Sequence, residues 1–201
     1  MTGWQLNDVE KDVLSELGNI GAGHAATALS VLLQQKVRMS VTAARICTFD
    51  EIADVVGGAE QLVVGVFLRM NGDISGNMFL LFSLESAKEL LQKLLPGKDE
   101  FDDFTDIEIS ALGEVGNILG GAYLNAISDL VLLNMNQTVP AVAVDMAGAI
   151  LDIGILMSGQ TSDSAILIDT SIFQGDKSID GHFFMLPDPE STAPLLRALG
   201  C

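Results

Sequence analysis

Residues 12–20 read DVLSELGNI, and residues 110–118 read SALGEVGNI. The two segments lie 98 positions apart, counted from Asn19 to Asn117, and the same offset aligns 28–30 with 126–128. A second match, 105 positions apart, aligns Ile74 and Gly76 with Ile179 and Gly181. Similar segments in the same order at similar offsets indicate an internal duplication, so the chain is predicted to contain one structural unit twice, with about seven extra residues in the second copy.

Hydrophobic periodicity predicts the same element order in both halves, α-β-α-β-β-α. Predicted helices cover 6–34, 50–56, 85–95, 106–132, 145–154 and 189–199, and predicted strands cover 37–44, 61–70, 73–83, 138–144, 164–172 and 181–186. Asn71-Gly72 indicates a hairpin turn between the second and third strands. Repeat one is placed at 6–95, an acidic linker at 96–105 and repeat two at 106–199.

Neither half has enough long strands to close a core of its own, which determines the predicted fold class. We expect a mixed α/β fold in which both repeats share one central sheet, related by a pseudo-two-fold axis. The whole chain, 1–201, is then a single domain, a size that buries a full core without disulfides or metals.

Composition limits the classes of function. The 201 residues are 49% hydrophobic and 18% charged, with a net charge of −17. That charge disfavours nucleic acids and anionic membrane surfaces as partners. The most apolar window, 138–157, contains Asp145 and Asp152, so membrane insertion is not expected. The first twelve residues are acidic rather than basic and apolar, which predicts no signal peptide and a cytoplasmic protein.

The repeated helix carries the candidate site. At 3.6 residues per turn, Asp12, Glu16 and Asn19 form one polar stripe, and Ser110, Glu114 and Asn117 form the other. Val13, Leu17 and Ile20, like their counterparts Ala111, Val115 and Ile118, are expected on the buried side. An amide donates to and accepts from water at once, which orients the water molecule, while a carboxylate binds a cation of a partner.

Two interpretations of this stripe remain open. The glycines beside it, Gly18 and Gly116 among them, permit close helix packing, and the polar residues are then an ordinary solvated face. Retention of Glu and Asn in both copies favours a function. Two isolated histidines and two distant cysteines form no metal-binding pattern, so no metal ligands are assigned.

The two segments resemble the CheC/CheX/FliY phosphatases of chemotaxis. Their motif is Asp or Ser, three residues, Glu, two residues, Asn, and Pro after a further twenty-two. Ser110, Glu114, Asn117 and Pro140 match it fully, whereas repeat one has Thr42 in place of the proline. Two motif copies are most similar to CheC.

The resemblance implies hydrolysis of the aspartyl phosphate of a CheY-like response regulator. In that scheme Asn19 and Asn117 orient the attacking water, and Glu16 and Glu114 bind a lysine of the receiver domain. The chain has no cofactor of its own, since the magnesium ion belongs to the receiver.

The resemblance also implies binding of CheD, a receptor deamidase, which we assign to the segment around Asp145. The alternative function is a non-enzymatic adaptor that binds CheD or a receiver domain. Because Pro140 fixes the backbone at the entry of its strand and Thr42 does not, the second site is expected to be the stronger.

Overall fold

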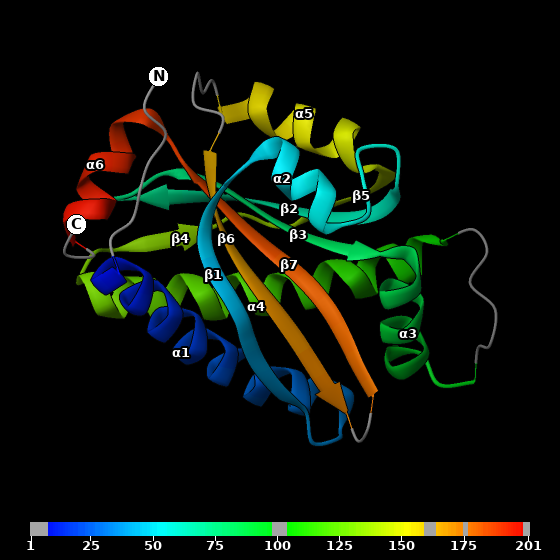
Figure 1. Ribbon diagram of the computed structural model, residues 1–201. Coiled ribbons are helices and arrows are strands. Elements are labelled where there is room, and N and C mark those ends of the chain that lie inside the picture. Colours follow the sequence, from blue (N-terminus) through cyan, green and yellow to red (C-terminus); the bar gives the residue numbers. More distant parts are fainter. Residues whose placement is uncertain (1–7, 98–103, 159–163, 175–176, 199–201) are drawn as a thin grey trace.

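The computed structural model describes residues 8–97, 104–158, 164–174 and 177–198 (Figure 1). The helices are α1 (Asp8–Leu33), α2 (Phe49–Val55), α3 (Leu84–Leu94), α4 (Asp106–Val131), α5 (Ala147–Ser158) and α6 (Pro189–Ala198). The strands are β1 (Arg38–Thr48), β2 (Leu62–Gly72), β3 (Gly76–Ser83), β4 (Met135–Gln137), β5 (Ala141–Met146), β6 (Ser164–Gln174) and β7 (Lys177–Pro187).

All seven described strands belong to one sheet, in the order β1-β6-β7-β3-β2, with β4 and β5 following each other along the outer edge of β2. Every described pair is antiparallel. This order has pseudo-two-fold symmetry. Exchanging β1 with β4 and β5, β6 with β2, and β7 with β3 leaves the strand order unchanged. Strand β1 of the first repeat pairs with β6 of the second, and β5 of the second pairs with β2 of the first. The predicted shared sheet is therefore confirmed.

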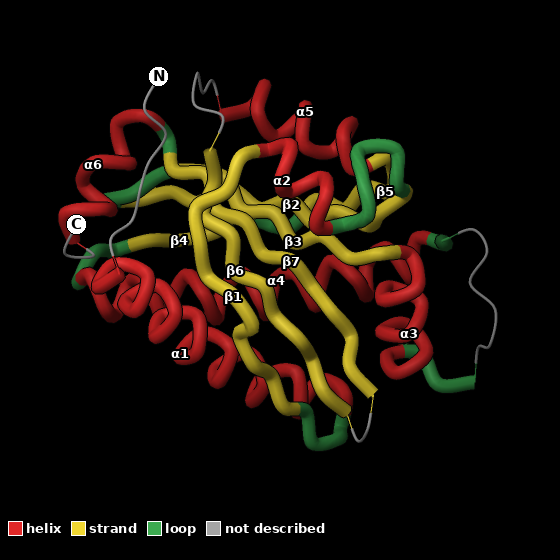
Figure 2. Tube along the Cα trace, viewed as in Figure 1, coloured by secondary structure: helices red, strands yellow, loops and turns green. Residues whose placement is uncertain are grey.

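Helices cover both faces of the sheet (Figures 1 and 2). The long helices α1 and α4 lie on one face and α2 and α5 on the other. Because side chains alternate along a strand, Val64, Val66 and Leu68 of β2 contribute to the core beneath α1 and α4. Val63 and Phe67 contribute to the core beneath α2 and α5.

Several predicted boundaries are wrong: β1 runs to Thr48 rather than to residue 44, and β7 begins at Lys177 rather than at residue 181. Asn71 and Gly72 do not form the hairpin turn; they extend β2 and pair with Asn136 and Met135 of β4. A Cβ on Gly72 would lie 2.2 Å from the carbonyl oxygen of Asn134, so the glycine serves this close strand contact.

The helix predicted at 145–154 begins instead at Ala147. Asp145 lies in β5, paired with Val63 of β2. The backbone amide of Ala147 donates to the carbonyl of Gln61 at 2.9 Å, which marks the end of the strand pairing.

Residues 98–103 of the predicted acidic linker lie outside the described residues. Helix α4 starts directly after Thr105, whose backbone amide donates to the Glu108 carboxylate at 2.7 Å. Within the described ranges, no helix is both long and apolar enough to span a membrane.

Candidate functional site on helix α4

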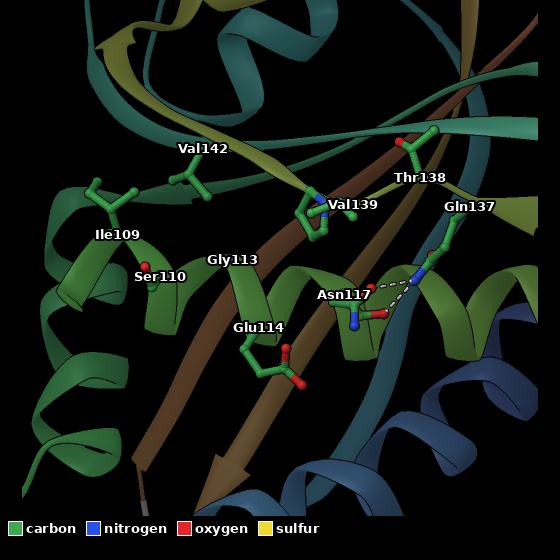
Figure 3. A pocket seen from close by; sticks show the side chains of 10 residues that line it. Ile109, Ser110, Gly113, Glu114, Asn117, Gln137, Thr138, Val139 and Val142 are labelled. Carbon is green, nitrogen blue, oxygen red and sulfur yellow. Dashed lines mark hydrogen bonds between the residues drawn. The ribbon is translucent and has the colours of Figure 1, made fainter. Parts of the chain in front are cut away.

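Helix α4 and the segment between β4 and β5 enclose a pocket of about 470 Å³ (Figure 3). It is lined by Ile109, Ser110, Gly113, Glu114, Asn117, Gln137, Thr138, Val139, Pro140 and Val142. The four residues that match the family motif in repeat two, Ser110, Glu114, Asn117 and Pro140, are therefore brought together. The helical spacing places the first three, and the strand connection places the proline.

Asn117 is half-buried and fixed by a neighbouring side chain. The Nε2 group of Gln137 donates to Asn117 Oδ1 at 2.8 Å and to the Asn117 backbone oxygen at 2.9 Å. The amide nitrogen of Asn117 points away from Gln137, toward the side on which the Glu114 carboxylate lies (Figure 3). Asn117 retains two N–H donors and one oxygen lone pair, enough to orient a water molecule.

Glu114 is exposed, so its carboxylate is accessible to a cationic group of a partner. Ser110, one helical turn earlier, is also exposed. No described hydrogen bond links Ser110 to a base. The pocket therefore suits positioning of water and of a partner better than nucleophilic attack by a side chain.

Gln137 was not identified from the sequence. The offset of 98 that aligns the repeats places Met39 of repeat one at its position, so the residue does not belong to the repeated pattern. A signal was present, because a polar residue replaces an apolar one three positions before the motif proline.

The predicted strand 138–144 is interrupted. Gln137 pairs with Met70 and Ala141 pairs with Phe67, so three residues, Thr138 to Pro140, lie opposite two residues of β2. This is a bulge, completed by hydrogen bonds in both directions between Thr138 and Arg69. Proline donates no backbone hydrogen bond and is accommodated at such a site.

The glycines of α4 bring the helix close to the sheet. A Cβ on Gly116 would lie 2.3 Å from Cγ1 of Val66, and one on Gly113 would lie 3.4 Å from Cγ2 of Val142. Gly116 therefore serves close packing of α4 on the sheet, as predicted from the glycines beside the stripe. By contrast, Gly23 of α1 has nothing within 4 Å of its Cβ position.

Repeat one presents its stripe differently. Asp12, Glu16 and Asn19 are all exposed on α1, and the Asn19 side chain makes no hydrogen bond to the described residues. Ile20, predicted to be buried, is 37% exposed. These side chains lie on the solvent-exposed side of α1.

Thr42 occupies the place of Pro140 in a bulge of its own. Val41 pairs with Thr170 and Ala43 with Asp169, which leaves Thr42 as the extra residue. The strand nevertheless continues as β1, and Val41 is half-buried, with a methyl group 3.0 Å from the Cβ position of Gly18. In repeat two the corresponding residue, Val139, is 88% exposed. The two copies therefore share a bulge but differ in what packs against the helix.

Asp145 lies outside the α4 pocket. It is exposed in β5, and its carboxylate accepts a hydrogen bond from the backbone amide of Met146 at 2.7 Å. Its neighbours Val144 and Met146 are 39% and 46% exposed. No group of three or more His, Cys, Asp or Glu side chains suited to a metal ion occurs in the described part of the chain.

Comparisons with known proteins agree with the motif. A model of the CheC-like family matches residues 9–41 and 107–144, which include both stripes. The CheY-P phosphatase CheC of Bacillus subtilis is 40% identical over 97% of this chain and 96% of its own length. FliY of Thermotoga maritima has a similar fold, with a TM-score of 0.79, 18% identity and 98% of each chain covered. CheX of Vibrio vulnificus aligns with a TM-score of 0.55 and 14% identity over 86% of this chain and 99% of its own.

The full-length similarity, the two motif copies and the seven-stranded duplicated sheet lead to one conclusion: the chain belongs to the CheC-like family.

Proposed function

We propose that this chain is a chemotaxis phosphatase that hydrolyses the aspartyl phosphate of a CheY-like response regulator. The observation that carries the proposal is the α4 pocket, where a fixed amide, Asn117, lies one turn from an accessible carboxylate, Glu114. The name of the Bacillus subtilis relative, CheY-P phosphatase, supports the same reaction.

Glu114 and Asn117 have different roles in this proposal. The Glu114 carboxylate binds a lysine of the receiver and docks its phosphorylated site against α4. Asn117 orients a water molecule for in-line attack on phosphorus, and the aspartate carboxylate of the receiver leaves. Phosphoryl transfer depends mainly on positioning and charge stabilisation, so no nucleophile on this chain is needed. Glu114 is the sole carboxylate among the residues that line the pocket, and we assign the magnesium ion to the receiver.

The test is release of inorganic phosphate from a phosphorylated CheY-like receiver, measured together with receiver binding. Asn117→Ala should reduce turnover at this site on the order of 10²-fold while binding survives, because the amide acts on water in the transition state. Glu114→Ala should weaken binding, because it removes a contact formed before the reaction. Equal losses of binding in both variants would contradict this division of roles.

The two sites are proposed to be unequal, and the structure supplies a physical reason. Asn117 is fixed beside a pocket, whereas Asn19 is exposed without a described hydrogen bond. Phosphate release should therefore fall more in Glu114→Ala/Asn117→Ala than in Glu16→Ala/Asn19→Ala. The reverse order would refute the ranking.

We further propose that the chain binds CheD through the segment around Asp145, on a surface separate from the phosphatase site. The supporting observations are that the Asp145 carboxylate is exposed on β5, outside the α4 pocket, and that its chain neighbours Val144 and Met146 are partly exposed. If the chain were only an adaptor, this surface would be its functional one, and the Glu–Asn stripe would be dispensable. We place both activities in the cytoplasm.

Asp145→Lys tests this surface in a pull-down with CheD. The matched control is Asp129→Lys, the same charge change at an exposed position of α4. Loss of CheD binding in the first variant alone, with phosphatase activity retained in both, is the expected result. Retention of CheD binding by Asp145→Lys would exclude Asp145 from the interface.

A further inference from the structure

The position of the Gln137 side chain depends on two glycines. A Cβ on Gly120 would lie 2.9 Å from Gln137 Oε1, and a Cβ on Gly121 would lie 3.3 Å from Gln137 Nε2. The first distance is shorter than real Cβ contacts allow. The glycines therefore form a recess in α4, and the amide of Gln137 lies in it.

The recess holds Gln137 in one orientation. Its Nε2 group makes both hydrogen bonds to Asn117, while its Oε1 atom is buried and has no hydrogen-bond partner among the described residues. A buried polar atom without a partner is unfavourable, and such an exception in a native fold needs an explanation. The two hydrogen bonds from Nε2 to Asn117 explain why Oε1 stays without a partner, since they are the side-chain hydrogen bonds of Gln137 among the described residues.

The first repeat serves as an internal comparison. It keeps the Glu and Asn of the stripe, but Met39 occupies the position of Gln137 and Ala22 that of Gly120. Ala22 is buried, so its methyl group fills the place of the recess. Methionine offers no N–H to an asparagine. The amide and the glycine that accommodates it are thus absent together from the copy in which Asn19 is exposed.

We propose that Gln137, held in the recess of Gly120 and Gly121, is a positioning residue that fixes the carboxamide of Asn117 with its nitrogen toward the pocket. This inference rests on the proposed function for its effect on turnover. Because Gln137 binds Asn117 Oδ1, the amide does not rotate between its two orientations, and its N–H donors are presented to water before the receiver arrives. A preorganised group needs no rearrangement during the reaction.

The direct test is Gln137→Met, which introduces the residue of repeat one. Turnover of the phosphorylated receiver should fall about 10-fold or more with KM unchanged, since misplacement of a catalytic group by a fraction of an ångström affects the transition state rather than docking. Activity should be measured in the Glu16→Ala/Asn19→Ala background, so that only the second site contributes. Equal changes in kcat and KM, or no change in kcat, would overturn the proposal.

A spectroscopic measurement tests positioning independently of catalysis. The side-chain NH₂ signal of Asn117, identified by its loss in Asn117→Ala, should show a rigid ¹⁵N heteronuclear NOE in the wild-type protein and a mobile one in Gln137→Met. An equally rigid Asn117 in both would overturn the inference. If the wild-type protein releases no phosphate from any receiver, the proposed function fails, while this measurement still decides the positioning role.

Gly120→Ala provides a second variant that retains Gln137. Its methyl group displaces the amide from the recess, so Asn117 mobility should rise and kcat should fall as in Gln137→Met. The matched control is Gly23→Ala, an alanine on α1 with open space around it. A Gly120→Ala protein with the wild-type kcat and a rigid Asn117 would refute the role of the recess.

Discussion

Substitution of Gly116 by alanine should separate helix propensity from packing at the site. In a helix, alanine is favoured over glycine by about 1 kcal/mol. At Gly116, however, the new Cβ would lie 2.3 Å from Cγ1 and 2.9 Å from Cβ of Val66, which is completely buried in a strand with neighbours on both sides. Overpacking of this kind costs about 1–3 kcal/mol, so Gly116→Ala should be destabilised by up to about 2 kcal/mol.

The control is Gly23→Ala, where the Cβ meets nothing within 4 Å and the propensity gain of up to about 1 kcal/mol should be retained. Urea unfolding followed by far-UV circular dichroism gives both free energies. In a Val66→Ala background, Gly116→Ala should become neutral or stabilising, since the colliding methyl groups are gone; this coupling defines the contact. If Gly116→Ala is as stable as Gly23→Ala, the close approach of α4 to β2 is refuted.

Three further outcomes are expected. Burial raises the pKa of Tyr123, the sole tyrosine of the sequence, to about 12. Absorbance titration should therefore show its ionisation well above pH 10, and the free energy of unfolding should fall as pH rises from about 10 toward 12, because the unfolded state loses the proton first. A titration midpoint near pH 10 in the folded protein would contradict this. Burial also raises the pKa of the Cys47 thiol to about 12, so in Cys201→Ser the native protein should resist a thiol reagent at pH 8 and react once unfolded. Asp188→Ala should lower the unfolding free energy by about 1–3 kcal/mol, because it leaves the half-buried Arg69 guanidinium without its bidentate partner, whereas Asp188→Asn should lose less.

The features predicted well from the sequence are those set by local periodicity and by the duplication. The helical repeat places Ser110, Glu114 and Asn117 on one stripe, and the motif spacing adds Pro140; the structure brings all four to one pocket. The repeated glycines indicated close packing, which the contact between Gly116 and Val66 confirms. The shared sheet followed from the small number of strands in each half.

The errors concern contacts between segments that are distant in sequence. Asn71-Gly72 has the local signature of a turn, yet the pairing with β4 extends the strand through it. Thr138 and Val139 are β-branched and favour a strand, but the bulge opposite β2 depends on register, which local residues do not define. Asp145 was assigned to a helix because no local signal shows that β5 continues to Met146.

The two copies differ in the strands that face the helices, and in the helices at Gly120 of α4, which aligns with Ala22 of α1. Both helices keep Glu and Asn at the same spacing, and both adjoining strands have one extra residue at the same position. In repeat one the strand continues through Thr42, so Val41 remains packed against Gly18. In repeat two Pro140 has no N–H with which to continue the pairing, the strand breaks, and Val139 turns to solvent. The α4 pocket lies at this break, and the residue that fixes Asn117, Gln137, comes from the strand that ends there. Conservation of Glu and Asn alone therefore does not make the two sites equivalent; the strand facing each helix decides which asparagine is held in place.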